Sequence, residues 1–179
     1  RQFSRFAAQY DDHNIVQREV AHTLVSKITN EPKTILDLGC GTGAVFKNIT
    51  WELKSFIGVD SSTSMCEAHP KALHVKILNT NFEDVLPFNP SVDLVVSSSA
   101  LQWANDLPSL FAKVASSSKS CAFAIFTCKT FASLHQMTGY TSSLPESETL
   151  KTLFEKHFEG ECEIKHYQVM FPDTLSMLR

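Results

Sequence analysis

The chain has 179 residues, which suits a single domain, and 43% of them are hydrophobic, which is enough to bury one core. Its 16 basic and 19 acidic residues give a net charge of -3 without a run of like charges, so nucleic acid is not an expected partner. No apolar run reaches the roughly 20 residues that span a bilayer. Residues 1–10 also lack the long apolar segment of a secretory signal, so we expect a cytoplasmic protein without a membrane partner.

The predicted elements begin with an amphipathic helix at residues 14–28, where apolar residues recur at helical spacing, and we expect residues 1–30 to form an N-terminal helical cap. Short apolar runs that suit buried parallel strands follow at residues 34–38, 55–60, 73–78, 92–97 and 121–127. Helices are predicted between these strands at residues 44–50, 62–68 and 107–116. Asp106 is the expected cap of the last of them, with Pro108 in its first turn. This alternation predicts an α/β fold, a doubly wound and mainly parallel sheet in one domain of residues 1–179.

The part of the chain after the fifth predicted strand begins with a long connection. Residues 129–143 lack a clear pattern, and we expect residues 129–150 to form a lid at the carboxyl edge of the sheet. A helix starts near Pro145, because acidic residues follow that proline in the first turn. A final strand is predicted at residues 162–171.

The cysteines and histidines do not suggest a metal site. The number of cysteines, five, is odd, and none of them forms a C-x-x-C pair. The seven histidines are scattered and lack the H-E-x-x-H spacing of a zinc-binding helix. We therefore expect free thiols and no metal.

The stretch T-I-L-D-L-G-C-G-T-G at residues 34–43 joins a predicted strand to a glycine-rich turn. A strand, a turn and a helix in succession place backbone N–H groups around one ligand. The spacing also admits the G-x-G-x-x-A form of a dinucleotide site, so the glycines alone leave the ligand open. Asp37, inside the strand, suits a cationic group and favours an amino acid moiety over a pyrophosphate. Asp60 closes the next strand, where an acidic group accepts hydrogen bonds from ribose hydroxyls, so a nucleoside is expected under either hypothesis.

Three stretches, in order, resemble the motifs of class I S-adenosylmethionine-dependent methyltransferases: I-L-D-L-G-C-G-T-G, G-V-D-S-S-T-S-M and V-D-L-V-V-S-S-S-A-L-Q-W. The resemblance implies that residues 39–41 line the methionine part of the cofactor and that Asp60 holds its ribose. It places Met65 near the adenine and Ser97 at the methionine end. Asn81 takes the position where the family commonly has an acidic residue that binds the adenine amino group. The implied cofactor-binding set is Tyr10, Gln17, Asp37, Gly39, Cys40, Gly41, Asp60, Ser61, Met65, Asn81, Phe82 and Ser97.

Other stretches are similar to one family within that class. F-S-R-F-A-A-Q-Y-D-D-H-N-I-V-Q-R-E-V-A at the amino terminus, S-A-L-Q-W-A-N-D-L, and L-H-Q followed by S-L-P-E resemble the malonyl-acyl carrier protein O-methyltransferases of biotin synthesis. The resemblance implies methylation of the free carboxylate of a malonyl thioester, with S-adenosylhomocysteine as the second product. That carboxylate is already ionised at pH 7, so no base has to remove a proton. We therefore expect Tyr10, Gln102 and Trp103 to position and enclose the reactants.

The same resemblance implies a transient partner, malonyl-acyl carrier protein, which is acidic in the family and would be guided by basic side chains. The candidates are Lys151, Lys156, Lys165 and Arg179. A monomer is expected.

The sequence departs from the family pattern in two places. The usual Pro-Gly-Gly turn before the fifth strand is replaced by S-S-S-K-S, and the family continues past D-T-L-S-M-L-R into a last antiparallel strand that this chain is expected to lack.

Three other functions remain open at this point. A methyltransferase acting on another small metabolite or a quinone-type ring would benefit from a base beside the methyl group. A non-catalytic assembly factor would keep the fold, although it would tolerate loss of the glycine loop or of Asp60, and both are intact. An oxidoreductase would bind a nicotinamide cofactor in the same loop.

Overall fold

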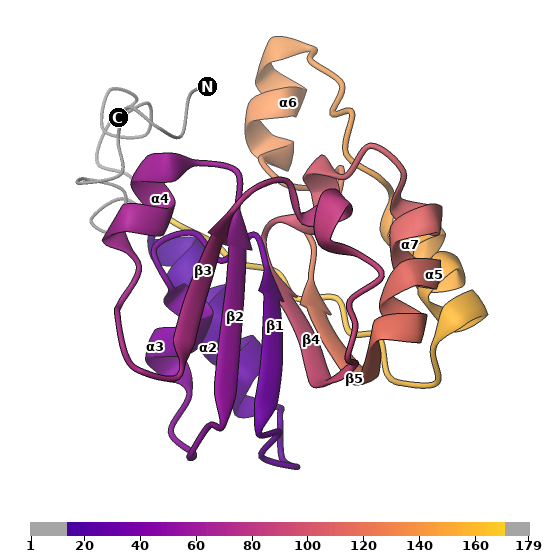
Figure 1. The fold of residues 1–179 in the computed structure, drawn as a ribbon. Coiled ribbons are helices and arrows are strands. Elements are labelled where there is room, and N and C mark those ends of the chain that lie inside the picture. The colour runs from indigo at the N-terminus through magenta and orange to yellow at the C-terminus, as the bar shows by residue number, and fades with distance from the viewer. Residues whose placement is uncertain (1–13, 171–179) are drawn as a thin grey trace.

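The computed structural model describes residues 14–170 and is built around one parallel sheet (Figure 1). Its five strands stand in the order β3-β2-β1-β4-β5, and every neighbouring pair is parallel. The strands are β1 (Thr34–Leu38), β2 (Ser55–Asp60), β3 (Val75–Asn79), β4 (Val92–Ser98) and β5 (Ser118–Ala124). The order confirms the predicted doubly wound α/β fold. It also places a topological switch between β1 and β4, where ligands of open α/β sheets bind.

Helices cover both faces of the sheet. They are α2 (Ile15–Ser26), α3 (Ala44–Asn48), α4 (Thr63–Ala68), α5 (Leu107–Ser117), α6 (Ala132–Thr138) and α7 (Ser147–His157), with short 3-10 turns η2 (Phe82–Val85) and η3 (Leu101–Trp103). One buried cluster joins α2 and α3 to the face that carries Ile35 and Phe56. The other joins α5 and α7 to the face that carries Leu36 and Val95. Consecutive side chains of the central strand thus pack into the two clusters on opposite faces, as expected for a parallel strand covered on both sides.

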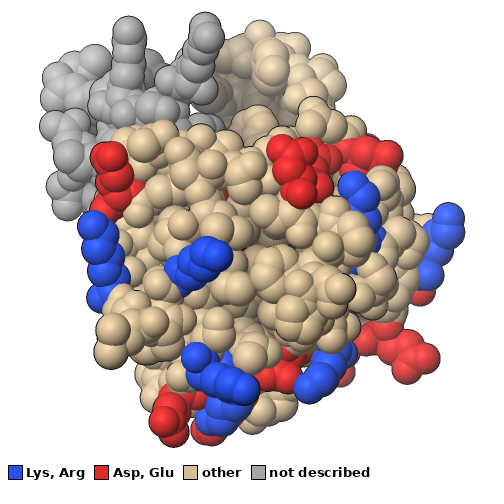
Figure 2. Space-filling model, viewed as in Figure 1, with Lys and Arg blue, Asp and Glu red and all other residues tan. Residues whose placement is uncertain are grey.

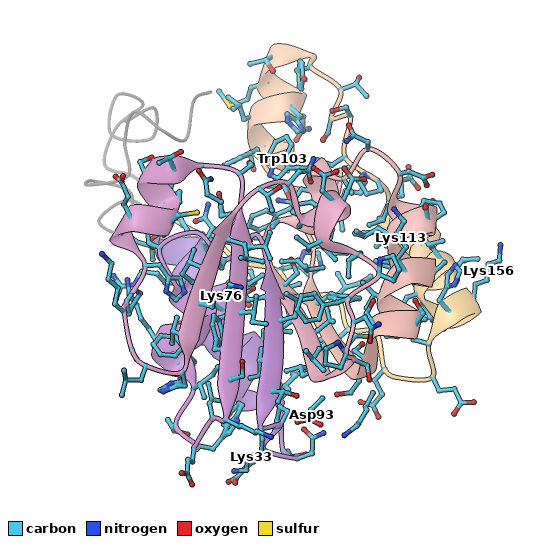
Figure 3. The ribbon with its side chains drawn as sticks, in the orientation of Figure 1. Lys33, Lys76, Asp93, Trp103, Lys113 and Lys156 are labelled. Carbon is cyan, nitrogen blue, oxygen red and sulfur yellow. The ribbon has the colours of Figure 1, made fainter. Side chains whose placement is uncertain are left out.

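Hydrogen bonds at the amino edge fix the sheet register. The Asp93 carboxylate in β4 accepts from the backbone N–H of Thr34 at 2.9 Å and from its hydroxyl at 2.9 Å. It also accepts from the Lys119 ammonium of β5 at 2.7 Å. These hydrogen bonds lower the pKa of Asp93, and the bond from Lys119 has the largest effect. Figure 3 shows Asp93 beside Lys33 at the edge opposite Trp103. These hydrogen bonds therefore join β1, β4 and β5 far from the carboxyl ends, where the glycine loop lies.

Several predicted elements are displaced. The third strand begins at Val75 and leaves Leu73 exposed, and the fifth begins at Ser118, three residues before its predicted start. The prediction for residues 129–150 did not include α6, which lies beyond the carboxyl edge of the sheet with no buried residue (Figure 1). Asp106 does cap α5, because its carboxylate accepts from the Ser109 N–H at 3.0 Å.

The strand predicted at residues 162–171 was wrong over the part that the structure describes. Residues 161–170 have no regular structure, and all of them are exposed. A strand needs a hydrogen-bonded neighbour, but this segment runs behind the sheet in Figure 1, where Glu163 pairs with Lys27 just after α2. Within residues 14–170, no helix combines the length and the apolar character that crossing a membrane requires.

Candidate active site

The glycine loop between β1 and α3 bends at the carboxyl edge of the sheet. Gly39 has φ +76 and Gly41 has φ +51, which favours glycine at both positions. A Cβ on Gly39 would lie 2.2 Å from the Cβ of Ala100, whereas one on Gly41 would meet nothing within 4 Å. The loop therefore packs tightly against the segment after β4 on one side and leaves open space at Gly41.

Asp60 ties this loop to the end of β2. Its carboxylate accepts from the backbone N–H of Gly41 at 2.9 Å and from that of Ser62 at 2.8 Å. Each carboxylate oxygen has a second lone pair, so the side chain still has acceptor capacity. The residue expected to hold a ribose is thus fixed in place and only half-buried.

Asp37 is a fully buried carboxylate in β1. It is 0% exposed, and neither of its oxygens has a hydrogen-bond partner among the described residues. Burial, and secondarily the charge of Asp60, raises the pKa of Asp37 from 3.8 to about 8. A buried carboxylate without a partner is costly, so its position directly before the glycine loop indicates that it binds a ligand group that carries a proton or a positive charge.

The segment after β4 forms the other wall. The hydroxyl of the fully buried Ser97 donates to the backbone carbonyl of Leu38 at 2.6 Å, which joins the ends of β4 and β1. Ser99 has φ +60, and its N–H donates to the carbonyl of Ala124 in β5 at 2.8 Å. The Gln102 side-chain amide donates to the Ser99 carbonyl at 2.8 Å. The wall is held by both flanking strands.

The remaining predicted cofactor residues are spread around this edge. Met65 is buried in α4, and Ser61 is exposed directly after Asp60. The Asn81 side-chain oxygen accepts from the Glu83 N–H at 3.0 Å and caps η2, the turn that begins with the half-buried Phe82. Their contacts with a cofactor stay predictions.

Of the three further predicted residues, one lies in the glycine loop, one lies in α2 and one is outside the described residues. Gln17 lies half-buried in the first turn of α2, and Cys40 is buried in the glycine loop. Burial raises the pKa of the Cys40 thiol, so it is not a nucleophile at neutral pH. Tyr10 lies outside the described residues.

Trp103 and α6 stand above the carboxyl edge. Trp103 is 63% exposed, and Figure 3 shows it near the top of the sheet, below α6. Phe131, Met137 and Tyr140 in and around α6 are also exposed apolar residues. No group of three or more metal-ligating side chains comes together in residues 14–170.

Sequence reasoning missed two residues of this edge, Ser98 and Ser99. Their hydroxyl oxygens, like the Gln102 side-chain carbonyl oxygen, are buried without a partner among the described residues. The signal was present, because three serines follow the apolar run at residues 94–96 directly. It was read only for Ser97.

Three features together define a class I methyltransferase. They are the parallel sheet, the glycine loop after its central strand and the acidic residue at the end of the neighbouring strand. Comparisons with known proteins agree. Residues 36–126 match the family described as methyltransferase domain. The chain belongs to this family.

Two curated relatives are malonyl-[acyl-carrier protein] O-methyltransferases. The one from Acetivibrio thermocellus is 33% identical over 74% of this chain and 50% of its own length. The one from Anoxybacillus flavithermus is 28% identical over 82% of this chain and 59% of its own length. The chain thus spans between half and three fifths of these two relatives.

Two solved structures share the fold. A Haloferax volcanii methyltransferase in complex with the Trm112 activator superposes with a TM-score of 0.69 at 21% identity, covering 87% of this chain and 75% of that one. The plantazolicin methyltransferase BpumL in complex with SAH gives 0.66 at 16% identity, covering 85% and 68%.

S-adenosylmethionine is the cofactor of this class, and the described residues fit it. The unpartnered Asp37 suits its ammonium group, and the clamped Asp60 suits its ribose. Gly41 lies between Asp37 and Asp60 in sequence, and the open space beside it leaves room for a ligand close to the backbone.

Proposed function

We propose that this protein transfers the methyl group of S-adenosylmethionine to the free carboxylate of a malonyl thioester on acyl carrier protein. The observation that carries the methyl transfer is the buried, unpartnered Asp37 beside a glycine loop that Asp60 clamps. The acceptor is supported by the malonyl-[acyl-carrier protein] O-methyltransferases that resemble the chain.

The wall after β4 suits an acceptor that is already ionised. Residues 97–103 are Ser, Ser, Ser, Ala, Leu, Gln and Trp, which can position an acceptor but do not take up a proton near pH 7. The cofactor supplies a methyl group on a positively charged sulfur. A carboxylate oxygen forms the new bond to that methyl carbon while the carbon–sulfur bond breaks and its electron pair stays on sulfur, so both charges disappear together and no proton moves. The protein's contribution is alignment and exclusion of water.

The partner belongs to the same proposal. Lys151 and Lys156 lie on α7, and Figure 3 shows Lys156 at the outer side of the molecule, away from Trp103. Lys151 lies 3.9 Å from Glu155, and Lys165 lies 3.9 Å from Glu163. Arg179 lies outside the described residues. Basic and acidic side chains are interspersed over the face in Figure 2, so docking there would rely on single lysines.

Intact mass spectrometry tests the proposal. Malonyl-acyl carrier protein is incubated with the full-length protein and S-adenosylmethionine, and a gain of one methylene on the malonyl group is expected. The acetyl thioester, which lacks the free carboxylate, should stay unmodified. If the malonyl thioester also stays unmodified while calorimetry shows cofactor binding, the acceptor assignment is refuted and the methyltransferase class is kept.

A further inference from the structure

We propose that the hydroxyls of Ser98 and Ser99 form a subsite that binds the acceptor carboxylate, and that Gln102 is a positioning residue for this subsite. The inference rests on the proposed function, because it assumes an anionic acceptor. The buried Gln102 side-chain carbonyl oxygen also has no partner among the described residues, but it only accepts hydrogen bonds and therefore does not bind the carboxylate. The inference begins from the two serine hydroxyls, which are buried and have no partner among the described residues. Buried polar atoms are nearly always hydrogen-bonded, so such a group indicates a ligand.

The location of the wall indicates which ligand. The sheet order β2-β1-β4 places Asp60, Asp37 and Ser98 at the carboxyl ends of three neighbouring strands. Asp37 is paired with Gly58, two residues before Asp60, and with Val96, two residues before Ser98. Because side chains two residues apart share a face and strands lie about 4.8 Å apart, the three side chains form a staggered row on one face near the carboxyl edge. Asp60 suits the ribose and Asp37 the ammonium of the cofactor. The next place in the row, on the far side of the switch between β1 and β4, is left for the molecule that receives the methyl group.

Contact between the two loops supports this placement. Ala100 packs so closely on Gly39 that a Cβ there would lie 2.2 Å from the Ala100 Cβ. A group held by Ser98 or Ser99 would therefore be next to the cofactor loop.

The backbone of Ser99 is held in a conformation that a non-glycine residue seldom adopts. Its φ of +60 is kept by two hydrogen bonds, from its own N–H to the Ala124 carbonyl and from the Gln102 amide to its carbonyl, each 2.8 Å long. Strain of this kind persists where the surrounding structure enforces it, and it is concentrated at ligand sites. Gln102 thus acts through Ser99, by fixing the loop.

Neutral hydroxyls suit an oxygen that must react. A lysine or arginine would hold a carboxylate more strongly, but it would also stabilise the charge that disappears when the ester forms. Residues 97–103 contain no basic residue. Two O–H donors can orient the carboxylate and release the neutral ester, and each charge-assisted hydrogen bond is worth about a tenfold to hundredfold change in binding.

The test compares Ser98→Ala and Ser99→Ala with the wild-type protein and with Ser116→Ala. Ser116 is a matched control on α5, where its hydroxyl donates to the Lys113 carbonyl away from the site. Calorimetry measures S-adenosylhomocysteine binding, and then malonate binding to the S-adenosylhomocysteine complex. Turnover of malonyl-acyl carrier protein gives KM and kcat. Thermal unfolding shows that each variant is folded.

We expect both serine variants to weaken malonate binding and raise KM about tenfold or more, with unchanged S-adenosylhomocysteine affinity. Ser99→Asn should restore much of the loss, because Asn supplies an N–H donor and tolerates positive φ. Unchanged malonate binding and KM would overturn the subsite while leaving the proposed function intact. Weaker S-adenosylhomocysteine binding would also overturn it, since the serines would then hold the cofactor. The serine variants could lose malonate binding while the wild-type protein fails to methylate malonyl-acyl carrier protein. That result would support the subsite and refute the proposed acceptor.

Discussion

Cofactor binding should release a proton from Asp37. Burial and Asp60 raise the pKa of Asp37 to about 8, so at pH 7 only about one tenth of the ligand-free protein carries the charge that the cofactor's ammonium group requires. Ionising the carboxyl group on binding should therefore release about 0.9 proton at pH 7. The affinity should also rise about tenfold between pH 6 and pH 7, where the ammonium group stays protonated.

The same carboxyl group should affect the stability of the ligand-free protein. Because the folded-state pKa is raised, the folded protein holds a proton that the unfolded chain loses between pH 3.8 and about 8. Stability falls as pH rises through that window, by at most about 6 kcal/mol at about 1.36 kcal/mol per pH unit. Asp37→Asn should remove this decline, and the variant should unfold at higher temperature than the wild type at pH 8.

Titration calorimetry with S-adenosylhomocysteine, in two buffers of different ionisation enthalpy, measures the proton release directly. Asp37→Asn should bind more weakly and with an affinity that does not change between pH 6 and pH 7. A wild-type protein that releases no proton and shows the same flat profile would refute the reasoning, because Asp37 would then stay neutral in the complex.

Further predictions concern the loop and the sheet register. Gly39→Ala should lower the free energy of unfolding by more than about 2 kcal/mol in urea, because its Cβ would overlap Ala100 at φ +76; Gly41→Ala, with open space at φ +51, should lose only about 1 kcal/mol. Asp60→Ala should weaken S-adenosylhomocysteine binding at least tenfold in calorimetry, since two backbone N–H groups lose their acceptor, and an unchanged affinity would remove the ribose assignment. Asp93→Ala should cost about 1–3 kcal/mol in urea at pH 7 with unchanged cofactor affinity. Its lowered pKa makes this contribution present above the ordinary Asp pKa and lost as pH falls, so an equal loss at acid pH would contradict it.

Local pattern was enough for the central strands. Buried apolar runs with glycine or aspartate at their ends gave β1 and β2 with their observed bounds. It failed at β3, because Leu73 is apolar but exposed, and exposure is decided by tertiary packing. It failed at β5, because Ser118 pairs with Val92 and Lys119 bonds to Asp93, and these contacts draw polar residues into a strand.

The candidate site was predictable to the extent that its residues follow strand ends. Asp37, Gly39 and Asp60 carry types whose chemistry is visible in the sequence, and the structure brings them together. The missing partners of Ser98 and Ser99 were not predictable, because whether a hydroxyl is satisfied depends on neighbours from other strands.

The central position of β1 has a consequence for the order of folding. β1 pairs with β2 soon after it in the chain, but its other edge waits for β4, and the Ser97–Leu38 bond spans 59 residues. Contacts this distant form slowly, and until they form one edge of β1 has no neighbouring strand. A nascent chain that ends before β4 would expose that edge and hold Asp37 without its second wall. Cofactor capture should therefore come late in synthesis, and it then stabilises strands from both halves of the sheet at once.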